Sequence, residues 1–229
     1  MKKKLVILTG AGISAESGIP TFRDSNGLWN NYKVEDVATP GAWLKNKELV
    51  LEFYNERRTQ IKNAEPNQAH RLLVNLEEKY DVYIITQNID DLHERAGSQK
   101  ILHLHGEILK SRSRKYPELI YDCPGDIKIG DLCEKGSQLR PHIVWFGEAV
   151  PMLPTAEGLV YDADILVIIG TSLQVYPAAS LFQLAPKSCP IYVVDPNLTE
   201  GVLPRKKVTY IKENATTGVE KLIDILMVD

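Results

Sequence analysis

The sequence predicts an α/β fold: a doubly wound, Rossmann-like parallel sheet with a smaller inserted module. Short, continuously apolar runs alternate along the chain with helical patterns, as in parallel sheets whose two faces are covered by helices. Glycine or polar residues follow these runs at once, and ligands bind at such strand ends in open α/β sheets. The clearest runs are residues 5–8, 82–86, 163–169 and 191–194.

Periodicity places the other elements. Apolar residues recur at helical intervals from 46 to 62, from Pro66 to Tyr80 and from 217 to 226, and Pro66 suits the first turn of its helix. A further helix is expected to start near Pro177. Residues Asp24 to Trp43 lack periodicity and are expected to form a long loop. Short strands are predicted at 101–104, 141–146 and 208–211.

Residues 107–140 change character, because turn sequences replace the periodic apolar pattern. We expect a small part made of residues 27–63, which are helical, and 107–140, which are rich in loops. The large Rossmann-like part would comprise residues 1–26, 64–106 and 141–229 of a single catalytic domain. The basic run 110–115 could suggest nucleic acid, but a solvated loop is the favoured interpretation.

The composition is that of a globular protein, with 44% hydrophobic residues and a net charge of -3. This charge gives no reason to expect nucleic acid or a membrane as partner, and no apolar run is long enough to span a bilayer. The apolar run after the N-terminal lysines is too short for a signal peptide, so we expect a cytoplasmic protein. Three cysteines without a C-x-x-C pair indicate neither a disulfide framework nor a standard zinc site.

The turn after the first strand resembles a dinucleotide-binding turn. Gly10 and Gly12 follow the apolar run, and Ala15 takes the third position of the G-x-G-x-x-G pattern, which its looser form allows. Glycines would let a phosphate approach backbone N–H groups at a helix start. A tight turn without a ligand is the alternative. The continuation from Ser17 to Arg23 is not needed by an ordinary dinucleotide-binding turn.

Polar residues gather after several later strands. Gln87, Asn88 and Asp90 follow the run 82–86, and their side chains suit ribose hydroxyls and a carboxamide, although a solvated turn is equally open. Asp90 is the natural cap of the next helix. His105 precedes Gly106 and could act as a general base, although a structural role is the alternative. Gly170, Thr171, Ser172 and Asp195 would reach the same edge, and a turn-forming role for Asp195 is equally open.

Five collinear motifs resemble the sirtuins, the NAD-dependent protein lysine deacylases. The resemblance runs from residue 5 to about residue 215 and implies the sirtuin fold and activity. Its motifs are Gly10-Ala-Gly-Ile-Ser-Ala-Glu-Ser-Gly-Ile-Pro-Thr-Phe-Arg23, Thr86-Gln-Asn-Ile-Asp-Asp-Leu-His93, Leu104-His-Gly106, Arg140-Pro-His-Ile-Val-Trp-Phe-Gly-Glu148 and Gly170-Thr-Ser-Leu173.

The resemblance implies a site for NAD, which the family consumes as a co-substrate. His105 would be the catalytic base acting on a ribose hydroxyl, and Asn88 would hold the nicotinamide ribose with Gln87. The products would be nicotinamide, deacylated lysine and O-acyl-ADP-ribose. The residues implied at NAD are Gly10, Ala11, Gly12, Glu16, Thr21, Phe22, Arg23, Trp29, Gln87, Asn88, Ile89, Asp90, Gly170, Thr171, Ser172, Asp195 and Ala215. Those implied at an extended acyl-lysine peptide, bound by strand addition, are Val144, Trp145, Phe146 and Gly147.

The acyl group is a separate question. Tyr54 and Arg57 lie three residues apart on the predicted helix, so both point to one side. An arginine fork binds a carboxylate bidentately, and a tyrosine hydroxyl can add a third hydrogen bond. The pair resembles the Tyr-x-x-Arg of sirtuins that remove succinyl and malonyl groups. We therefore expect acidic acyl groups to be preferred over acetyl; a surface arginine packed over a tyrosine ring is the alternative.

The chain departs from the sirtuin pattern in its cysteines. Sirtuins usually carry four cysteines between the catalytic histidine and the Trp-Phe-Gly-Glu stretch, whereas this interval holds only Cys123 and Cys133. Two thiolates cannot complete a four-ligand zinc shell, and His142 is poorly placed, so we predict no zinc and no other metal. The module would then depend on an apolar cluster of Leu119, Ile120, Ile127, Ile129 and Leu132. A second departure is Asp195, where the family usually has an asparagine nearby.

Two other functions use the same pocket. Mono-ADP-ribosyl transfer or NAD hydrolysis would not need Tyr54 and Arg57. A non-catalytic NAD or ADP-ribose sensor would be expected to lack the base, and His105 is present. A dehydrogenase is disfavoured, because it would need a second strand ending in an acid about 20 residues past the glycines. The expected partners are acyl-lysine proteins, and the default oligomeric state is a monomer.

Overall fold

The computed structural model describes residues 2–21, 28–29, 32–197, 203 and 207–228. Within them, six parallel strands form the main sheet in the order β11-β10-β9-β1-β4-β5. The chain builds outward from the central strand β1 in both directions, which is a doubly wound topology. The strands are β1 (Lys4–Thr9), β4 (Asp81–Thr86), β5 (Ile101–His103), β9 (Ile165–Ile169), β10 (Ile191–Val194) and β11 (Val208–Ile211).

The register of the three central strands sets the position of the site. Thr9 of β1 pairs with Thr86 of β4 on one side and with Ile169 of β9 on the other. Because the strands are parallel and in step, the turns after all three begin at the same level of the sheet. The switch point therefore lies where β1 separates β4 from β9.

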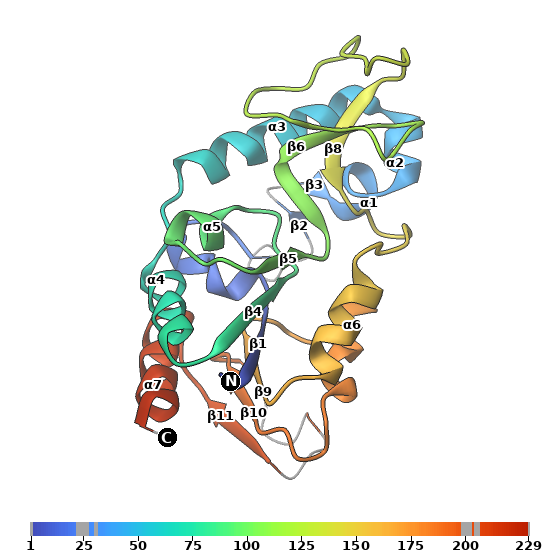
Figure 1. Cartoon of the computed structure of the whole chain (residues 1–229). Helices are drawn as coiled ribbons and strands as arrows, with labels where there is room; N and C mark the ends of the chain where they lie inside the picture. The colour runs from blue at the N-terminus through green and yellow to red at the C-terminus, as the bar shows by residue number, and fades with distance from the viewer. Residues whose placement is uncertain (1, 22–27, 30–31, 198–202, 204–206, 229) are drawn as a thin grey trace.

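Two apolar layers cover the sheet. On one face, α4 (Gln68–Asn75) and α7 (Ala215–Val228) pack over Leu5, Ile7 and Val167. On the other face, α6 (Leu153–Tyr161) and the 3-10 helix η4 (Ala178–Leu184) pack over Val6, Leu8 and Ile168. Figure 1 shows α4 and α7 on one side of the sheet and α6 on the other. Alternate residues of β1 thus enter different cores, as strand geometry requires.

A second part of the molecule lies beyond the end of this sheet, at the top of Figure 1. Its antiparallel sheet has the order β7-β6-β8, and helices pack around it with a core of their own. Its strands are β6 (Gly106–Ser113), β7 (Ile120–Asp122) and β8 (Leu139–Ile143), and its helices are α1 (Val34–Val37), α2 (Pro40–Lys45) and α3 (Lys47–Asn63). The short pair β2 (Leu28–Trp29) and β3 (Tyr32–Lys33) precedes α1, and α5 (Leu92–Ala96) connects β4 to β5.

Helix α3 is the longest described helix, and its ends follow from local chemistry. The side chain of Asn46 accepts a hydrogen bond from Leu49 N at 3.1 Å, which caps the first turn. The helix ends at Asn63, and Ala64 is extended two residues before a proline. Its buried face includes Phe53, Tyr54 and two arginines.

These elements confirm the predicted fold class and correct several details. We expected a loop from Asp24 to Trp43, and this prediction is wrong for residues 34–43, where α1 and the start of α2 form. Thr39 Oγ1 accepts from Ala42 N at 3.0 Å, and Pro40 takes the first turn of α2. Pro66 lies outside its helix, because Asn67 is the N-cap. The sequence patterns also missed α6.

The basic run and the predicted apolar cluster also need correction. Residues Lys110–Ser113 belong to strand β6, where Lys110, Ser111 and Arg112 pair with β7, so this part is not a loop. Only Ile127 of the five predicted cluster residues is buried. Leu119 is half-buried, whereas Ile120, Ile129 and Leu132 are 44%, 49% and 54% exposed. Contacts to α3 hold this segment instead.

Among the described residues, no helix combines the length and the apolar character that crossing a membrane would require.

Candidate functional site

A cavity of about 520 Å³ lies at the carboxyl ends of the main strands, where both parts of the molecule contribute to its lining. It gathers every expected site residue whose side chain the structure describes. These residues are Gly10, Ala11, Gly12, Glu16, Thr21, Tyr54, Arg57, Gln87, Asn88, Ile89, Asp90, His105, Val144, Trp145, Phe146, Gly147, Gly170, Thr171, Ser172, Asp195 and Ala215. Phe22 and Arg23 lie outside the described residues, as does the side chain of Trp29, which belongs to β2.

The glycine turn after β1 crosses the turn after β9 at very short range. Gly10 N donates to Ile169 O at 3.0 Å, and Gly12 N donates to Gly170 O at 2.9 Å. A Cβ on Gly12 would stand 2.6 Å from the Gly170 Cα, so this contact between two backbones requires glycine on both sides. The contact gives these glycines a structural reason that the sequence pattern alone did not reveal.

No α-helix starts at this turn, contrary to the sequence-based prediction. The chain forms two three-residue 3-10 turns, Ala11–Ile13 and Ala15–Ser17, and Gly18 ends the second with a φ of 83°. The Glu16 carboxylate accepts hydrogen bonds from Thr216 N and Thr216 Oγ1, at 2.9 and 2.7 Å. These bonds anchor the turn to the first residues of α7.

The amide of Asn88 is held in a buried network. Its Nδ2 donates to Gly10 O at 3.2 Å and to Ser14 Oγ at 3.1 Å. Ser14 Oγ in turn donates to Asp90 Oδ2 at 3.0 Å, and Asp90 Oδ1 accepts from Leu92 N at 3.2 Å. Asp90 thus binds the first N–H of α5, but the N-cap residue is Asp91, so the predicted cap is wrong by one residue. Ser14 connects the turn after β1 to the turn after β4.

Burial controls the charge of Asp90. The side chain is 5% exposed, and desolvation raises its pKa, while the hydrogen bonds from Leu92 N and Ser14 lower it. Asp90 also acts electrostatically on the guanidinium of Arg57. The cavity wall thus brings a buried carboxyl group and a buried cation into the same electrostatic environment.

The imidazole of His105 is fixed by one hydrogen bond. Its Nδ1 lies 3.0 Å from Gln87 O, and this nitrogen must donate because a carbonyl oxygen can only accept. In the neutral ring, Nε2 then carries the lone pair. Burial lowers the pKa of His105 below 6.5, although the bond to Gln87 acts in the opposite direction.

Gly106 allows the chain to turn directly after His105. Its φ is 83°, and a Cβ there would stand 2.0 Å from His142 O, so no other residue fits without rearrangement. His103 does not lie on the same face as His105, because β5 ends at His103. Its Nε2 contacts Glu94 Oε1 at 2.7 Å and its Nδ1 contacts Asn88 O at 3.2 Å, and it does not line the cavity.

The turn after β9 provides the opposite wall. Gln87 Nε2 donates to Thr171 Oγ1 at 3.1 Å, and Leu173 N donates to the same oxygen at 3.3 Å. Asp195 is 6% exposed, and its Oδ1 accepts from Asn197 N at 2.8 Å. Asp195 therefore shapes the turn after β10 and also lines the cavity, so the two interpretations of this residue are compatible.

The segment 144–147 borders the cavity with several N–H groups already engaged. Val144 N donates to His105 O at 2.9 Å, and Phe146 N donates to Ala38 O at 3.0 Å. Trp145 N donates to Glu148 Oε2 at 2.9 Å. Glu148 forms a bidentate ion pair with Arg140, with two contacts of 2.8 Å, and the Arg140 guanidinium lies 3.4 Å from the centre of the Trp145 ring. This pair stabilises the conformation of the segment.

Tyr54 and Arg57 of α3 reach the cavity from the small part. Tyr54 is fully buried, and its hydroxyl and the Trp145 Nε1 lie near each other without a well-formed hydrogen bond to any described group. Arg57 is 3% exposed, and its Nη1 lies 3.5 Å from Gln60 Oε1. Burial lowers the pKa of Arg57 to about 10, so the side chain stays cationic at neutral pH.

The two cysteines of residues 107–140 contact separate partners. Cys123 Sγ donates to Gly125 O, and Cys133 Sγ donates to Ser113 Oγ, both at 3.3 Å. No group of three or more His, Cys, Asp or Glu side chains suited to a metal ion occurs among the residues described. The side chains present therefore do not fit the four-ligand zinc site of the sirtuin pattern.

Sequence reasoning missed several residues that line the cavity. Ser14 carries the central hydrogen bonds of the Asn88 network, and Tyr176 and Asn214 also contribute to the wall. Ser14 stands four residues after Gly10, inside the motif that indicated the site. Its position in that motif was the available signal.

If the six strands of the main sheet are numbered along the chain, their order in space is 3-2-1-4-5-6, the Rossmann order. A nucleotide-sized cavity at the switch point of such a sheet defines a Rossmann-type nucleotide-binding protein. The sequence matches the model of the Sir2 family over residues 10–177. The chain belongs to the Sir2 family, which confirms both the predicted family and the expectation of an NAD-consuming enzyme.

Named relatives and solved structures are similar to this protein over nearly its whole chain. An "NAD-dependent protein deacylase" of Helicobacter pylori (strain ATCC 700392 / 26695) is 56% identical over 225 residues, covering 98% of each chain. One of Bacteroides thetaiotaomicron is 49% identical over 231 residues, again covering 98% of each. A crystal structure of a Sir2 homologue in complex with NAD has a TM-score of 0.87 and 40% identity, covering 99% of this chain and 90% of the other.

A structure of lower sequence identity was solved with a peptide and an acetylated ADP-ribose. This Sir2 protein, bound to a deacetylated p53 peptide and 3'-O-acetyl ADP ribose, has a TM-score of 0.83 and 33% identity, with 98% of this chain and 94% of that chain covered.

Proposed function

We propose that this protein removes acyl groups from protein lysine side chains at the expense of NAD, with a preference for succinyl and malonyl over acetyl. One observation carries the preference. A buried cation, Arg57, and a buried hydroxyl, that of Tyr54, line the same cavity as Asn88 and His105. A buried cation that borders a cavity attracts an anionic group strongly, because solvent screens the interaction little there. The carboxylate of a succinyl or malonyl group is such an anionic group.

An acetyl group would not bind Tyr54 and Arg57 in this way. It offers a methyl group where the acidic acyl groups offer a carboxylate, so Arg57 and Tyr54 gain no new hydrogen bonds. Sites built to bind a polar group discriminate against analogues that lack it, because the analogue forgoes the hydrogen bonds that the site offers. The preference is therefore a property of α3 rather than of the NAD-binding turns.

The other end of the cavity suits NAD. Gly10, Gly12 and Thr171 bring backbone and hydroxyl groups to the switch point, and Asn88 and Asp90 offer amide and carboxyl groups beside them. Bound there, NAD would supply the ADP-ribosyl group that accepts the acyl group. His105 would take a proton on Nε2, because its Nδ1–H is held by Gln87 O.

A lysine peptide would be bound along residues 144–147. Because the N–H groups of Val144 and Phe146 already donate to His105 O and Ala38 O, we propose that strand addition here relies on the carbonyl oxygens of the segment. Recognition through backbone would make the enzyme tolerant of peptide sequence and selective for the acyl group.

We also propose that the small part contains no zinc, because Cys123 and Cys133 are engaged with separate partners. The division into large and small parts, a monomeric state and a cytoplasmic location stay predictions of the sequence.

The acyl preference is tested by kinetics on matched peptides that differ only in succinyl, malonyl or acetyl at one lysine. Tyr54→Phe and Arg57→Met are expected to lower kcat/KM for the acidic acyl peptides by ~10- to 100-fold, since charge-assisted hydrogen bonds contribute about 1.5–3 kcal/mol each. The acetyl peptide should change far less. An acyl preference that survives both substitutions unchanged would refute the assignment.

A further inference from the structure

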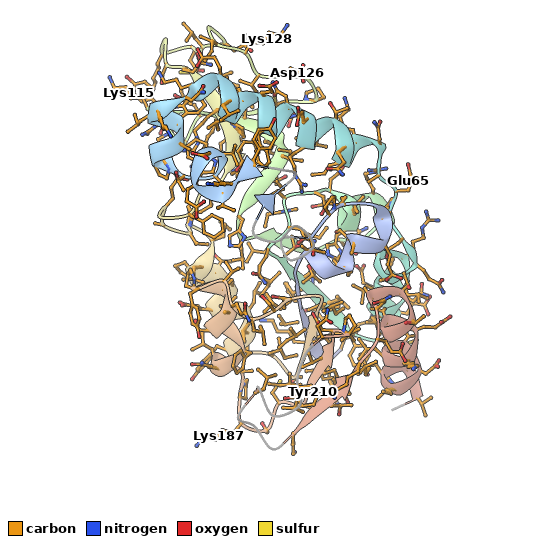
Figure 2. All side chains as sticks on the ribbon, turned by 180° about the vertical axis from the view of Figure 1, so that it is seen from behind. Glu65, Lys115, Asp126, Lys128, Lys187 and Tyr210 are labelled. Atoms are coloured by element: carbon orange, nitrogen blue, oxygen red, sulfur yellow. The ribbon has the colours of Figure 1, made fainter. Side chains whose placement is uncertain are left out.

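Helix α3 presents two neighbouring stripes of functional side chains. Tyr54 and Arg57 lie on the stripe that lines the cavity. Asn55 and Arg58 are each one residue further along, so they lie on the adjacent stripe, about 100° around the helix. That stripe faces the segment around Ile127, near Asp126 and Lys128, which lie beside α3 at the end of the molecule in Figure 2.

Asn55 binds the backbone of Ile127 in two places. Its Nδ2 donates to Ile127 O, and its Oδ1 accepts from Ile127 N, both at 3.0 Å. The side-chain amide therefore pairs with residue 127 as a neighbouring strand would. The Ile127 side chain is 2% exposed and belongs to the same apolar core as Tyr54 and Trp145. Fixing residue 127 thus completes the packing behind the acyl end of the cavity.

Arg58 extends this connection to the main site. Its Nη1 donates to Asn55 Oδ1 at 2.7 Å, and its Nε donates to Ile108 O at 2.9 Å. Ile108 N in turn donates to Ile89 O at 2.9 Å, in the turn that carries Asn88 and Asp90. Arg58 is 1% exposed, and burial lowers its pKa, whereas Cys123 and Asp126 act to raise it. Its contacts are therefore made inside the protein and are little screened by solvent.

A third contact holds the same segment from the end of the helix. Lys62 Nζ donates to Pro124 O at 2.7 Å. The segment 124–127 is therefore bound to α3 by side chains that reach its backbone, in a part of the described chain where no cluster of metal-ligating side chains occurs. Ile129, two residues beyond this segment, does not add to the packing, because its side chain is 49% exposed.

From these contacts we propose that Asn55 and Arg58 are positioning residues of the acyl pocket. By binding residue 127 and strand β6 to α3, they fix the rotation of the helix and hence the place of Tyr54 and Arg57 relative to Asn88 and His105. The inference rests on the proposed preference for acidic acyl groups. A small misplacement of a positioned group can reduce rates by up to about 100-fold, so a slightly rotated helix would lose acyl selectivity before it lost its fold.

The test measures kcat and KM for matched succinyl and acetyl peptides in wild type, Asn55→Ala and Asn55→Asp. Asn55→Ala removes both bonds to residue 127 and should lower the succinyl-to-acetyl ratio of kcat/KM about 10-fold, mainly through KM for the succinyl peptide. Asn55→Asp keeps the acceptor and loses the donor, so it should give an intermediate ratio even if Asn55→Ala fails to fold. Arg58→Lys, which keeps the charge but not the fork, should also lower the ratio.

Glu56→Gln is the matched control. Glu56 lies between Asn55 and Arg57 on the same helix turn, but its side chain is exposed. Its substitution should therefore leave the succinyl-to-acetyl ratio unchanged. KM for NAD and the melting temperature are recorded for every variant. A lower melting temperature with an unchanged succinyl-to-acetyl ratio, or an equal loss on both peptides, would show a purely structural role and overturn the inference.

The two proposals fail in different ways. A wild-type protein with no preference for the succinyl peptide would refute the proposed function, and the selectivity inference with it. A wild-type preference that Asn55→Ala and Asn55→Asp both retain would refute only the role of Asn55 and Arg58.

Discussion

The imidazole Nδ1 of His105 lies 3.0 Å from the carbonyl oxygen of Gln87. This contact selects the tautomer in which Nε2 accepts a proton, and it comes from the same turn that holds Asn88. The proposed general base and the residues proposed to hold the ribose are therefore positioned by one segment, which follows β4.

The pH dependence of turnover follows from the His105 environment. Burial lowers the pKa of His105 below 6.5, so the ring is neutral, and able to act as a base, at lower pH than an exposed histidine. The acid limb of kcat/KM for an acyl peptide should therefore have its midpoint below pH 6.5. A midpoint above 6.5 would contradict this environment.

Replacing the base should leave binding in place. His105→Ala is expected to lower kcat by roughly 10²- to 10⁴-fold, the usual contribution of a general base. NAD binding, measured by calorimetry, should persist, because the Asn88 network does not include the His105 ring. Loss of NAD binding together with kcat would indicate a structural role for His105.

Ser14 provides a test of the network that sequence reasoning missed. Ser14→Ala removes the group that accepts from Asn88 and donates to Asp90, and it leaves both side chains buried with one bond fewer. KM for NAD should rise about 10-fold, because a lost bond to a buried polar group costs about 1–3 kcal/mol. Ser113→Ala is the control, since Ser113 is also buried and accepts hydrogen bonds, from Tyr116 N and Cys133 Sγ, but does not line the cavity. Equal effects of both substitutions would argue against the network.

Stability in mild acid should depend on His70. The ring is fully buried against His93, with ring centres 5.0 Å apart, and burial lowers the pKa of His70 to about 4. The unfolded chain binds this proton near pH 6.5 and the folded protein only near pH 4. The free energy of unfolding therefore has its full value above pH 6.5 and decreases as the pH falls from 6.5 to 4. The decrease is up to roughly 3 kcal/mol, because each unit of pKa difference corresponds to about 1.36 kcal/mol.

Denaturant unfolding at pH 7.0 and 4.5 measures this loss. His70→Gln has no proton to gain over this range, so its free energy of unfolding should fall less between the two pH values than that of wild type. Parallel losses in both proteins would assign the acid sensitivity to other groups, of which the equally buried His93 is the first candidate.

Removal of metal should have no effect. The thiols of Cys123 and Cys133 donate to Gly125 O and Ser113 Oγ, so chelation and the double change Cys123→Ser with Cys133→Ser should leave deacylation within about twofold. Metal analysis of the purified protein should find well under one zinc per chain. One zinc per chain, released by chelator with loss of activity, would contradict the proposal.

The strands of the main sheet could be predicted because each carries its own signal. Residues 5–8 and 165–169 are buried on both faces, which requires a continuous apolar run whatever the neighbours are. The short helices α1 and α2 carry no such signal. They depend on the Thr39 cap and on Trp43, whose ring lies 5.7 Å from that of Trp145, a partner far along the chain.

The sequence indicated which residues gather at this cavity, but it did not indicate the contacts between them. The motifs named Asn88, His105 and Gly12, and the parallel register brings them to one edge. The motifs did not indicate that Ser14 would bridge Asn88 and Asp90, or that Gly12 is required by Gly170 rather than by a ligand alone. Such contacts join turns that are distant in sequence, so no local pattern records them.

A competition between two peptides in one reaction tests the acyl preference of the protein directly. Wild-type protein, NAD and equal amounts of a succinyl-lysine and an acetyl-lysine peptide of the same sequence are mixed, and the products are followed by mass spectrometry. We expect O-succinyl-ADP-ribose in excess of O-acetyl-ADP-ribose, with the excess lost in Arg57→Met. Free ADP-ribose without either ester, or an excess of O-acetyl-ADP-ribose, would contradict the proposed preference.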